Sequence, residues 1–321
     1  MNFWKNKRVL VTGGHGFLGS FVVQRLQSQS ATVFAPTRAQ FDLRRKADIA
    51  SLYATTAPEV VIHLAASVGG LAANIANPGL FFYDNLKMGM EMLEVGREHG
   101  LHKFVQMGSA CEYPQESSVP MREDALWLGY PEKTNAPYGI AKKALLVQGQ
   151  AYREQYGMPV IHLLSTNLYG PGDDFDLNTS HVIAAIIRKC VTAQKEGMAS
   201  VSLWGTGEAT RDSLYVRDAV NGILLAAEHY DSPDPVNLGT GIGMSIRELA
   251  ELIKELTGYT GTLVWDASQP SGQLHRYLDT SRAETFGFKA TWSLRDGLME
   301  TIEWYRNRLR IAQEAFDRGM Q

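Results

Sequence analysis

The first half of the chain alternates short apolar runs with segments of helical pattern, and no other feature constrains the fold as much. The apolar runs RVLVTG, ATVFAP, EVVIHLA, KFVQMGS and PVIHLL begin at residues 8, 31, 59, 103 and 159. The helical patterns lie between them, at about 17–28, 44–56, 77–98 and 136–156. Runs without polar alternation are typical of strands buried on both faces, and strand–helix repetition gives a parallel sheet covered by helices. We therefore predict an α/β fold with a Rossmann-type, doubly wound parallel sheet.

The regular alternation ends after the sequence Tyr169-Gly170-Pro171-Gly172. Beyond it we expect helices at about 181–195 and 217–229 and strands near 200–204, 211–216 and 235–238. Ser245 is followed by Glu248 at the spacing of a capping box, so another helix should begin there. We predict a large domain of 1–172 and about 213–241, with a smaller C-terminal α/β lobe of about 173–212 and 242–321. We expect the last ten or so residues to be loosely held.

Charge and composition exclude several classes of partner. The chain has 34 acidic and 31 basic residues, a formal net charge of −3, so nothing favours a nucleic acid as partner. Neither a signal-peptide pattern nor an apolar run of about 20 residues is present, so no membrane partner is expected. Two cysteines without a CxxC pair make neither a disulfide framework nor a zinc site. We expect a cytoplasmic protein without a bound metal.

A glycine-rich turn joins the first predicted strand to the first predicted helix. The stretch TGGHGFLG begins at Thr12 and places Gly13, Gly16 and Gly19 at GxxGxxG spacing. Such glycines permit a tight turn, close approach of the backbone to a pyrophosphate, and close packing of helix on strand. The helix N-terminus then offers free N–H groups to the phosphates. A purely structural turn is the alternative, but the strand–turn–helix context favours a dinucleotide-binding site.

The end of the second predicted strand indicates which dinucleotide binds. Sites that prefer NAD place an acid there for the ribose 2′-hydroxyl, whereas this chain has APTR at 35–38 and no acid before Asp42. The Arg38 guanidinium could pair with a 2′-phosphate, unless it is a solvated surface arginine. NADP(H) is therefore the predicted cofactor, with Asp42 and Leu43 beside its adenine.

Three side chains form a candidate acid–base set. Tyr138 and Lys142 are a YxxxK pair, which a helix places on one face a turn apart. Tyrosine has a pKa of about 10, and we expect the lysine ammonium beside it to lower that pKa toward neutrality. Ser109 ends the run KFVQMGS and can donate a hydrogen bond to a substrate carbonyl. A YxxxK pair alone arises often by chance, so the serine strengthens the hypothesis.

In this order, the glycine loop, the strand-end serine and the YxxxK helix resemble the extended short-chain dehydrogenase/reductase family over nearly the whole chain. The resemblance implies that Ser109, Tyr138 and Lys142 are catalytic and that hydride passes between a nicotinamide and a sugar carbon. It also implies that Tyr138 handles the alcohol proton and that Lys142 holds the nicotinamide ribose. The cofactor residues that it implies are Gly13, Gly16, Phe17, Leu18, Gly19, Arg38, Asp42, Leu43, Leu64, Ala65, Ala66, Tyr138, Lys142, Asn167, Leu168 and His181.

Within that family, the sequence after Ser109 distinguishes two chemistries. Dehydratases carry an Asp-Glu pair there, where this chain has Ala110 and Cys111, with Glu112 one place late. The stretch GSACEYP instead resembles the GDP-L-fucose synthase family. So do AASVGG (65–70), Asn85 in YDNLKM, NAPYGIAK (135–142), TNLYGP (166–171), SHVI (180–183), LWGTG (203–207) and TRDSLYVRD (210–218). GDP-mannose 3,5-epimerases share the Ser-x-Cys-x-Tyr-Pro element, but SHVI followed by a basic pair looks more like the synthases.

The resemblance assigns Cys111 as base and His181 as acid in the inversion of C3 and C5 of a 4-keto sugar. The carbonyl acidifies the protons on these carbons, and thiol and imidazole pKa values of about 8.5 and about 6.5 bracket neutrality. The alternatives are that Cys111 is a small core hydrophobe and that His181 lies on the surface at a helix start. We interpret Cys190 as core and His63 as a buried strand histidine without a role in proton transfer. We expect the Glu112 side chain to point away from the site.

For the GDP moiety, the resemblance points to a basic residue on the helix after His181, together with Trp204 and Arg211. A surface ion pair is the alternative for Arg211. The full set of implied substrate residues is Asn85, Asn167, Arg188, Lys189, Trp204, Arg211 and Arg276, with Arg188 and Lys189 as alternatives. Relatives often have Asp-Gly where this chain has Ser271-Gly272, which leaves the nucleoside and the sugar open.

The resemblance therefore implies NADPH-dependent 3,5-epimerisation and 4-reduction of GDP-4-keto-6-deoxy-D-mannose to GDP-L-fucose. It also implies a homodimer that pairs through two helices per subunit, including the YxxxK helix. One alternative is a related 4-keto-sugar reductase or epimerase that acts on another GDP-sugar, for example a deoxyheptose. The other is a non-catalytic NADP-binding protein, which would be expected to have lost Tyr138 or Lys142.

Overall fold

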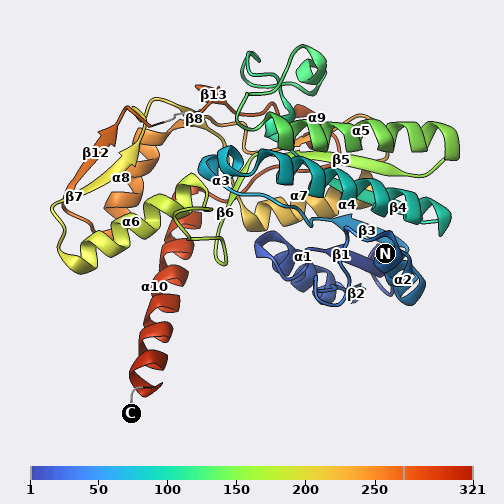
Figure 1. The fold of residues 1–321 in the computed structure, drawn as a ribbon, viewed down its shortest axis with the longest axis horizontal. Helices are drawn as coiled ribbons and strands as arrows, with labels where there is room; N and C mark the ends of the chain where they lie inside the picture. The colour runs from blue at the N-terminus through green and yellow to red at the C-terminus, as the bar shows by residue number, and fades with distance from the viewer. Residues whose placement is uncertain (1, 270–271, 320–321) are drawn as a thin grey trace.

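A six-stranded parallel sheet forms the centre of the computed structural model, which describes residues 2–269 and 272–319 (Figure 1). Its order is β10-β5-β4-β3-β1-β2. The strands are β1 (Arg8–Thr12), β2 (Thr32–Phe34), β3 (Val60–His63), β4 (Lys103–Ser109), β5 (Val160–Ser165) and β10 (Val236–Leu238). Every neighbouring pair is parallel, so the predicted parallel sheet is confirmed.

Helices cover both faces of this sheet because successive strand residues are apolar on opposite sides. On one face, α1 (Phe17–Ser28) and α7 (Val216–His229) pack against Val9 and Val11. On the other, α2 (Lys46–Thr56) and α4 (Pro78–Glu98) pack against Leu10. α5 (Ala136–Tyr156) lies against α4. The sheet is therefore doubly wound, as predicted, and it buries apolar side chains on both faces.

Three smaller sheets and three amphipathic helices make up most of the rest of the second half. β7 (Ser200–Trp204) pairs with β12 (Thr262–Asp266), and β6 (Asn167–Tyr169) pairs with β9 (Ser213–Tyr215). β8 (Thr210–Arg211) lies between β11 (Met244–Ser245) and β13 (His275–Arg276). α6 (Val182–Glu196), α8 (Ile246–Thr257) and the first part of α10 (Leu294–Gly319) enclose a separate apolar core. The capping box predicted for Ser245 and Glu248 is confirmed at the start of α8.

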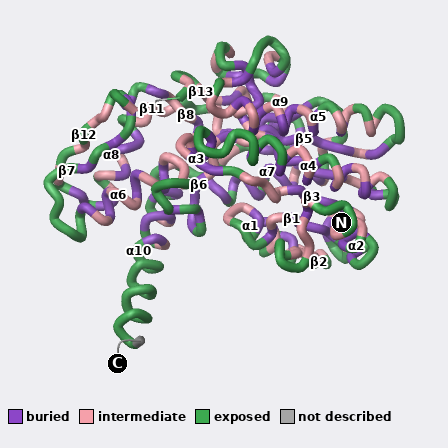
Figure 2. Tube along the Cα trace, viewed as in Figure 1, coloured by how far each residue is buried: buried purple, intermediate pink, exposed green. Residues whose placement is uncertain are grey.

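The structure differs from the sequence-based prediction at several elements. The single strand expected at 211–216 is divided into β8 and β9 by Asp212, whose buried carboxylate accepts hydrogen bonds from Thr240. The short helix α3 (Leu71–Ala76) was not predicted. The last ten residues were expected to be loosely held, yet α10 continues to Gly319, and Figure 2 shows it becoming exposed toward its end. Among the described residues, no helix is long and apolar enough to cross a membrane.

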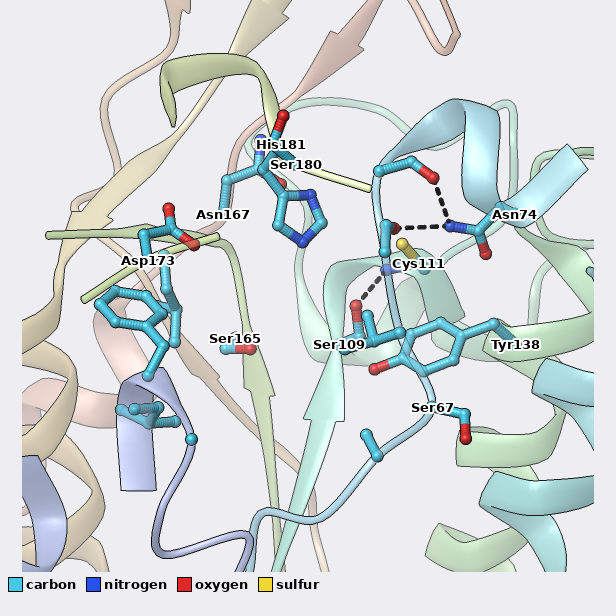
Figure 3. A pocket seen from close by; sticks show the side chains of 18 of the residues that line it. Ser67, Asn74, Ser109, Cys111, Tyr138, Ser165, Asn167, Asp173, Ser180 and His181 are labelled. Atoms are coloured by element: carbon cyan, nitrogen blue, oxygen red, sulfur yellow. Dashed lines mark hydrogen bonds between the residues drawn. The ribbon is translucent and has the colours of Figure 1, made fainter. Parts of the chain in front are cut away.

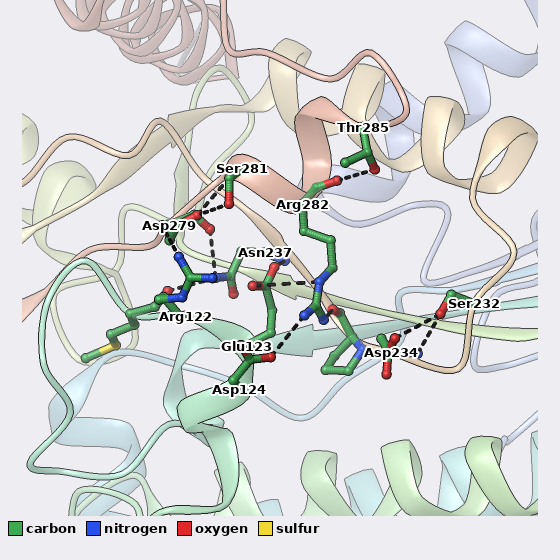
Figure 4. A network of polar contacts seen from close by, with 12 residues as sticks. Arg122, Glu123, Asp124, Ser232, Asp234, Asn237, Asp279, Ser281, Arg282 and Thr285 are labelled. Atoms are coloured by element: carbon green, nitrogen blue, oxygen red, sulfur yellow. Dashed lines mark hydrogen bonds and ion pairs between the residues drawn. The ribbon is translucent and has the colours of Figure 1, made fainter.

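A polar network joins the loop after β4 to the segment that follows β13 (Figure 4). The Asn237 side chain donates to the carbonyl oxygens of Met121 and Asp279, at 2.9 Å each. The backbone N–H of Asn237 donates to Glu123, at the start of the 3-10 helix η2 (Glu123–Trp127). Beyond it lies α9 (Ser281–Glu284), whose Ala283 packs in the core of the large sheet although we had assigned 242–321 to the lobe. The network thus fixes β13, and with it Arg276, over the large domain.

Candidate active site

The main cavity, of about 960 Å³, opens where the strand order reverses. After β1 the chain adds β2 on one side, then returns to place β3 on the other, and ligands of such sheets bind beyond the carboxyl ends of the strands at this point. The cavity wall includes residues that follow β1, β3 and β4, together with residues of α6, β7 and β13. It therefore has a side formed by the large sheet and a side formed by the second half of the chain.

The glycine turn after β1 lets neighbouring backbone segments come closer together than side chains would allow. Gly13 has a φ of +69°, and a Cβ there would lie 2.9 Å from the backbone nitrogen of Ala65. A Cβ on Gly19 would lie 2.1 Å from the carbonyl oxygen of Gly13, so α1 packs on the turn only with glycine at this position. α1 begins at Phe17 with no side-chain cap, which leaves its N–H groups open toward the cavity. The turn fits a dinucleotide diphosphate.

One part of the cavity wall carries two arginines, Arg38 and Arg44, and two acids, Asp42 and Asp84. The Asp42 carboxylate is already paired with Arg44 at 2.6 and 2.9 Å. Hydrogen bonds from Arg44 hold the pKa of Asp42 well below its ordinary value. Arg38, which is exposed and also lines the cavity, makes no such pair with any described residue. Arg44, which also lines the wall, was missed from the sequence because its position two residues after Asp42 carried no motif.

All residues predicted for the cofactor line this one cavity, although they come from six separate stretches of sequence. They are Gly13, Gly16, Phe17, Leu18, Gly19, Arg38, Asp42, Leu43, Leu64, Ala65, Ala66, Tyr138, Lys142, Asn167, Leu168 and His181. His63 precedes Leu64 and is buried, with its Nδ1 2.8 Å from the Thr12 hydroxyl. Burial lowers the pKa of His63 to about 3, so it stays neutral, as expected of a structural strand histidine.

Ser109, Tyr138 and Lys142 meet at the end of β4 (Figure 3 labels the serine and tyrosine). Lys142 Nζ donates to the Met107 carbonyl at 3.0 Å, and burial lowers the lysine pKa to about 8 while Glu112 opposes that shift. We expected Lys142 to lower the pKa of Tyr138, but burial instead raises it, with only a hydrogen bond to Ser109 opposing. The physical reason is that the phenol is desolvated while the ammonium is turned to a carbonyl oxygen.

Cys111 lies in a tight turn directly after β4, in the 3-10 helix η1 (Ala110–Glu112). Its backbone N–H donates to Ser109 Oγ at 3.2 Å, and its Sγ accepts a hydrogen bond from Arg276 Nη1 at 3.4 Å. Arg276 also donates to Asn167 Oδ1 at 3.3 Å. The thiol is half-buried and lines the cavity, whereas Cys190 is fully buried in the apolar core of the lobe, as expected. The turn, rather than an extended chain, brings Cys111 beside Ser109.

His181 approaches the same space from the start of α6 (Figure 3). Its position depends on the loop before it, because the Gly70 N–H donates to the Thr179 carbonyl at 2.7 Å and a Cβ on Gly70 would lie 2.3 Å from the Ser180 oxygen. Burial lowers the pKa of His181 and the charge of Arg276 lowers it further, while Asp174 opposes both. The free protein therefore holds this imidazole neutral at pH 7. It is half-buried in the wall of the cavity rather than on the open surface.

The structure separates the predicted substrate residues into two groups. Asn167, Lys189, Trp204, Arg211 and Arg276 line the cavity. Burial and the neighbouring Arg276 lower the pKa of Arg211 to about 9. Arg188 does not line this cavity: it donates to the Phe175 carbonyl at 2.8 Å and borders a second, smaller one, since it lies on another side of α6 from Lys189. The departure that we noted at Ser271 lies outside the described residues.

Asn85 is a support for the cavity wall and does not line it. It is buried, it donates to the Ser67 carbonyl at 2.8 Å, and it accepts from the Ser67 N–H at 3.1 Å. It thereby holds the loop 65–70, which does line the cavity. The structure agrees with the expectation that the Glu112 side chain points away from the site, because Glu112 does not line the cavity; its carboxylate is completely buried and accepts a hydrogen bond from the Ser109 N–H. The spacing Ser109-x-x-Glu112 is a capping box, and this signal could have predicted that Glu112 holds the turn after Ser109.

Asp173, which sequence reasoning also missed, predicts a distinctive dependence of stability on pH. Burial raises its pKa to about 7, so between about pH 4 and 7 the folded protein binds more protons than the unfolded chain, and stability falls as the pH rises. Asp173→Asn cannot ionise and should stabilise the protein at pH 8 by on the order of 2 kcal/mol more than at pH 5. Unfolding in denaturant without added cofactor measures this difference. An equal gain at both pH values would contradict it.

The fold and this cavity together define a dinucleotide-binding α/β enzyme of the short-chain dehydrogenase/reductase type. The chain belongs to the NAD dependent epimerase/dehydratase family, whose model matches residues 9–239. It is 39% identical over 302 residues to GDP-L-fucose synthase 1 of Arabidopsis thaliana, covering 94% of each chain. Among solved structures, a GDP-6-OMe-4-keto-L-xylo-heptose reductase from C. jejuni is similar with a TM-score of 0.90 and 28% sequence identity, and the match covers 94% of this chain and 98% of that one. A GDP-L-fucose synthetase from Naegleria fowleri bound to NADP has a TM-score of 0.86 and 26% identity, and the match covers 95% of this chain and 96% of that one.

Proposed function

We propose that the protein catalyses NADPH-dependent 3,5-epimerisation and 4-reduction of GDP-4-keto-6-deoxy-D-mannose to GDP-L-fucose. One observation carries this proposal: the reductase group Ser109 and the candidate base Cys111 occupy a single turn in the wall of the cavity that also contains Tyr138. An enzyme that only reduces its substrate would need Ser109 and Tyr138 but not Cys111. The similarity to GDP-L-fucose synthases over almost the whole chain supports the same reading.

In the epimerisation, the Cys111 thiolate accepts a proton from the carbon beside the carbonyl and becomes the thiol, and the protonated imidazole of His181 returns one to the opposite side and becomes neutral. Ser109 and Tyr138 hydroxyls stabilise the enolate oxygen that forms in between. Because Tyr138 is buried and Ser109 is half-buried, these hydrogen bonds act in a medium poorer in water and are stronger than in solution. Bound diphosphate would favour the charged form of His181, offsetting the lowering of its pKa in the free protein.

In the reduction, Tyr138 donates its phenolic proton to the oxygen on C4, and Ser109 holds that oxygen in place. NADPH, when bound, supplies the hydride. The raised pKa of Tyr138 keeps the phenol protonated at neutral pH, which is the form that a proton donor needs. Lys142 lies a turn further along α5, with its ammonium 5.8 Å from the tyrosine ring centroid, and its positive charge favours the phenolate left after proton transfer.

NADPH is proposed over NADH because of the charges in one part of the cavity wall. Asp42, which we expect beside the adenine, is paired with Arg44, and Arg44 also lies 3.9 Å from Asp84. Arg38 lines the same cavity and makes no ion pair with a described residue. A guanidinium pairs well with a phosphate dianion. The NADP bound to the similar Naegleria fowleri synthetase supports this choice.

The direct test is a turnover assay with GDP-4-keto-6-deoxy-D-mannose and either NADPH or NADH. We expect NADPH to be oxidised faster than NADH and the product to be GDP-L-fucose, identified by chromatography and proton NMR. If NADPH is not oxidised, the reductase proposal fails. If it is oxidised but the product keeps the original configuration at C3 and C5, the epimerase half fails.

A related sugar remains a second candidate because of one comparison. The GDP-6-OMe-4-keto-L-xylo-heptose reductase from C. jejuni has a TM-score of 0.90 with this chain. The same assay with a GDP-4-keto-heptose decides between the two substrates by the ratio of kcat/KM values. A non-catalytic role is disfavoured because Ser109, Tyr138 and Lys142 are all present and lie in one cavity.

We also propose a homodimer that pairs through α4 and α5. Phe82, Tyr83 and Met90 on α4 and Val147 on α5 are exposed apolar side chains on two helices that pack side by side. Light scattering should give a mass twice that of one chain, and Val147→Glu should lower it by burying a charge in the interface. Ile311→Glu on the exposed end of α10 is the matched control and should leave the mass unchanged. A monomer at micromolar concentration would contradict the proposal.

Both cysteines are free thiols in the structure. Free thiols are typical of reducing compartments. Together with the proposed use of NADPH and a GDP-sugar, this supports a cytoplasmic location.

A further inference from the structure

A buried ionisable pair lies directly behind the turn that carries Ser109 and Cys111. The Glu112 side chain is completely buried, and its Oε1 accepts the backbone N–H of Ser109 at 2.8 Å. His162 Nε2 on β5 lies 3.0 and 3.1 Å from the two carboxylate oxygens. The Ser109 hydroxyl in turn accepts the Cys111 N–H. One carboxylate therefore holds the turn on which both candidate reactive groups sit.

The backbone around this pair leaves it no freedom. A Cβ on Gly108 would lie 2.2 Å from His162 Nε2 and 2.5 Å from Glu112 Oε1, so the strand passes the pair only as glycine. On the other side, a Cβ on Gly139 would lie 2.2 Å from the Cys111 carbonyl oxygen, so α5 presses on the same turn. The turn is thus clamped between β4, β5 and the helix that carries Tyr138. A small change in the pair must move the turn relative to that helix.

The pair is costly for a role in packing alone. His162 Nδ1 is buried and has no hydrogen-bond partner among the described residues. A buried polar atom without a partner lowers stability, and two apolar side chains of similar volume would avoid that cost. The carboxylate also opposes the loss of charge that burial imposes on Lys142, so its influence extends to the reductase group. Such a pair is better explained by what it positions.

We propose that Glu112, backed by His162, is a positioning residue for both half-reactions, because it fixes Ser109 and Cys111 relative to Tyr138. This rests on the proposed function for its kinetic consequences, but the positioning itself can be measured without any substrate. The structure assigns no contact between Glu112 and the cavity, so the residue acts through the turn and touches no substrate.

The test compares Glu112→Leu with the double variant Glu112→Leu/His162→Leu. The single change should lower kcat about 100-fold, since misplacement of reactive groups by about 1 Å has this effect, with KM within about threefold of wild type. The double change removes the unpaired imidazole and should recover thermal stability without recovering kcat. Recovery of kcat together with stability would overturn the proposal, since the pair would then be packing alone. Tyr113→Phe, which breaks the neighbouring buried bond to Asn237, is the control and should keep kcat.

A second measurement needs no substrate and separates this proposal from the proposed function. Iodoacetamide should alkylate Cys111 about tenfold faster in Glu112→Leu than in wild type, because the loosened turn exposes the half-buried thiol. Cys190, which is fully buried, is the internal control for general unfolding and should stay unmodified. Unchanged alkylation of Cys111 would overturn the proposal even if the enzyme is active. Faster alkylation in a protein that turns over no 4-keto sugar would support it while the proposed function fails.

Discussion

Tyr138→Phe should abolish reduction of the 4-keto sugar and leave NADPH bound nearly as tightly as in wild type. The phenol supplies the proton that the C4 oxygen needs, and phenylalanine fills the same buried space without a proton to give. Loss of a positioned general acid lowers rates by about 10²- to 10⁴-fold. We therefore expect kcat for NADPH oxidation to fall about 1,000-fold, measured at 340 nm with saturating substrate.

Tyr152→Phe is the matched control for this change. Tyr152 lies on the same helix, almost four turns beyond Tyr138, and its hydroxyl donates to Glu94 away from the cavity. It should keep full turnover. NADPH affinity, followed by the fluorescence of the bound cofactor, should be alike in all three proteins. A Tyr138→Phe enzyme that keeps more than about a tenth of wild-type turnover would show that another group donates the proton.

The sequence was sufficient for the large sheet because its signals there are local. The continuous apolar runs and the glycine turn at Gly13 each depend only on residues that are adjacent in sequence. The strands and the turn that they predict are also the ones that pack together in the folded protein. The strand expected at 211–216 failed for the opposite reason. Asp212 is held by Thr240, far along the chain, and no local pattern announces a buried carboxylate that interrupts pairing.

The sequence indicated most of the residues that line the cavity, but not how these residues are oriented or which of them touch. The resemblance pointed to Cys111, and Cys111 does line the cavity, but the tight turn η1 that brings it beside Ser109 was not predicted. The choice between Arg188 and Lys189 depends on the rotation of α6 against the sheet, which sequence spacing does not give. Arg276 reaches the Cys111 thiol across 165 positions of sequence, and only the folded chain shows that contact.

The direction of two pKa shifts could not be read from the sequence either. A lysine near a tyrosine lowers the phenol pKa only if the charge outweighs the loss of water around the ring. In the structure Tyr138 and Lys142 are both buried, so desolvation raises the first pKa and lowers the second. The pKa values of the YxxxK pair thus depend on how deeply β4 and α5 bury its two side chains. The motif alone does not reveal that depth.

Cys111→Ser should abolish epimerisation while leaving a measurable reductase. The thiol is the proposed base for the carbon acid and lies beside Ser109 in the cavity wall, and a serine hydroxyl is far too weakly acidic to replace it near neutral pH. Ser109, Tyr138 and Lys142 are untouched, so NADPH oxidation should continue on the substrate that has not been inverted. We expect exchange of the C3 and C5 protons to slow about 10³-fold, measured in D₂O without NADPH by mass spectrometry of the sugar.

The control for this variant is Cys190→Ala, which removes the other thiol of the chain. Cys190 is fully buried in the apolar core of the lobe and does not line the cavity, so this change should cost stability and leave exchange intact. If Cys111→Ser exchanges both protons at the wild-type rate, the thiol is packing, and the base must be sought elsewhere in the wall. If exchange stops but reduction stops with it, the turn has moved, and the effect belongs to the arrangement that Glu112 maintains. Only the loss of exchange with reduction retained assigns the proton transfer to the sulfur.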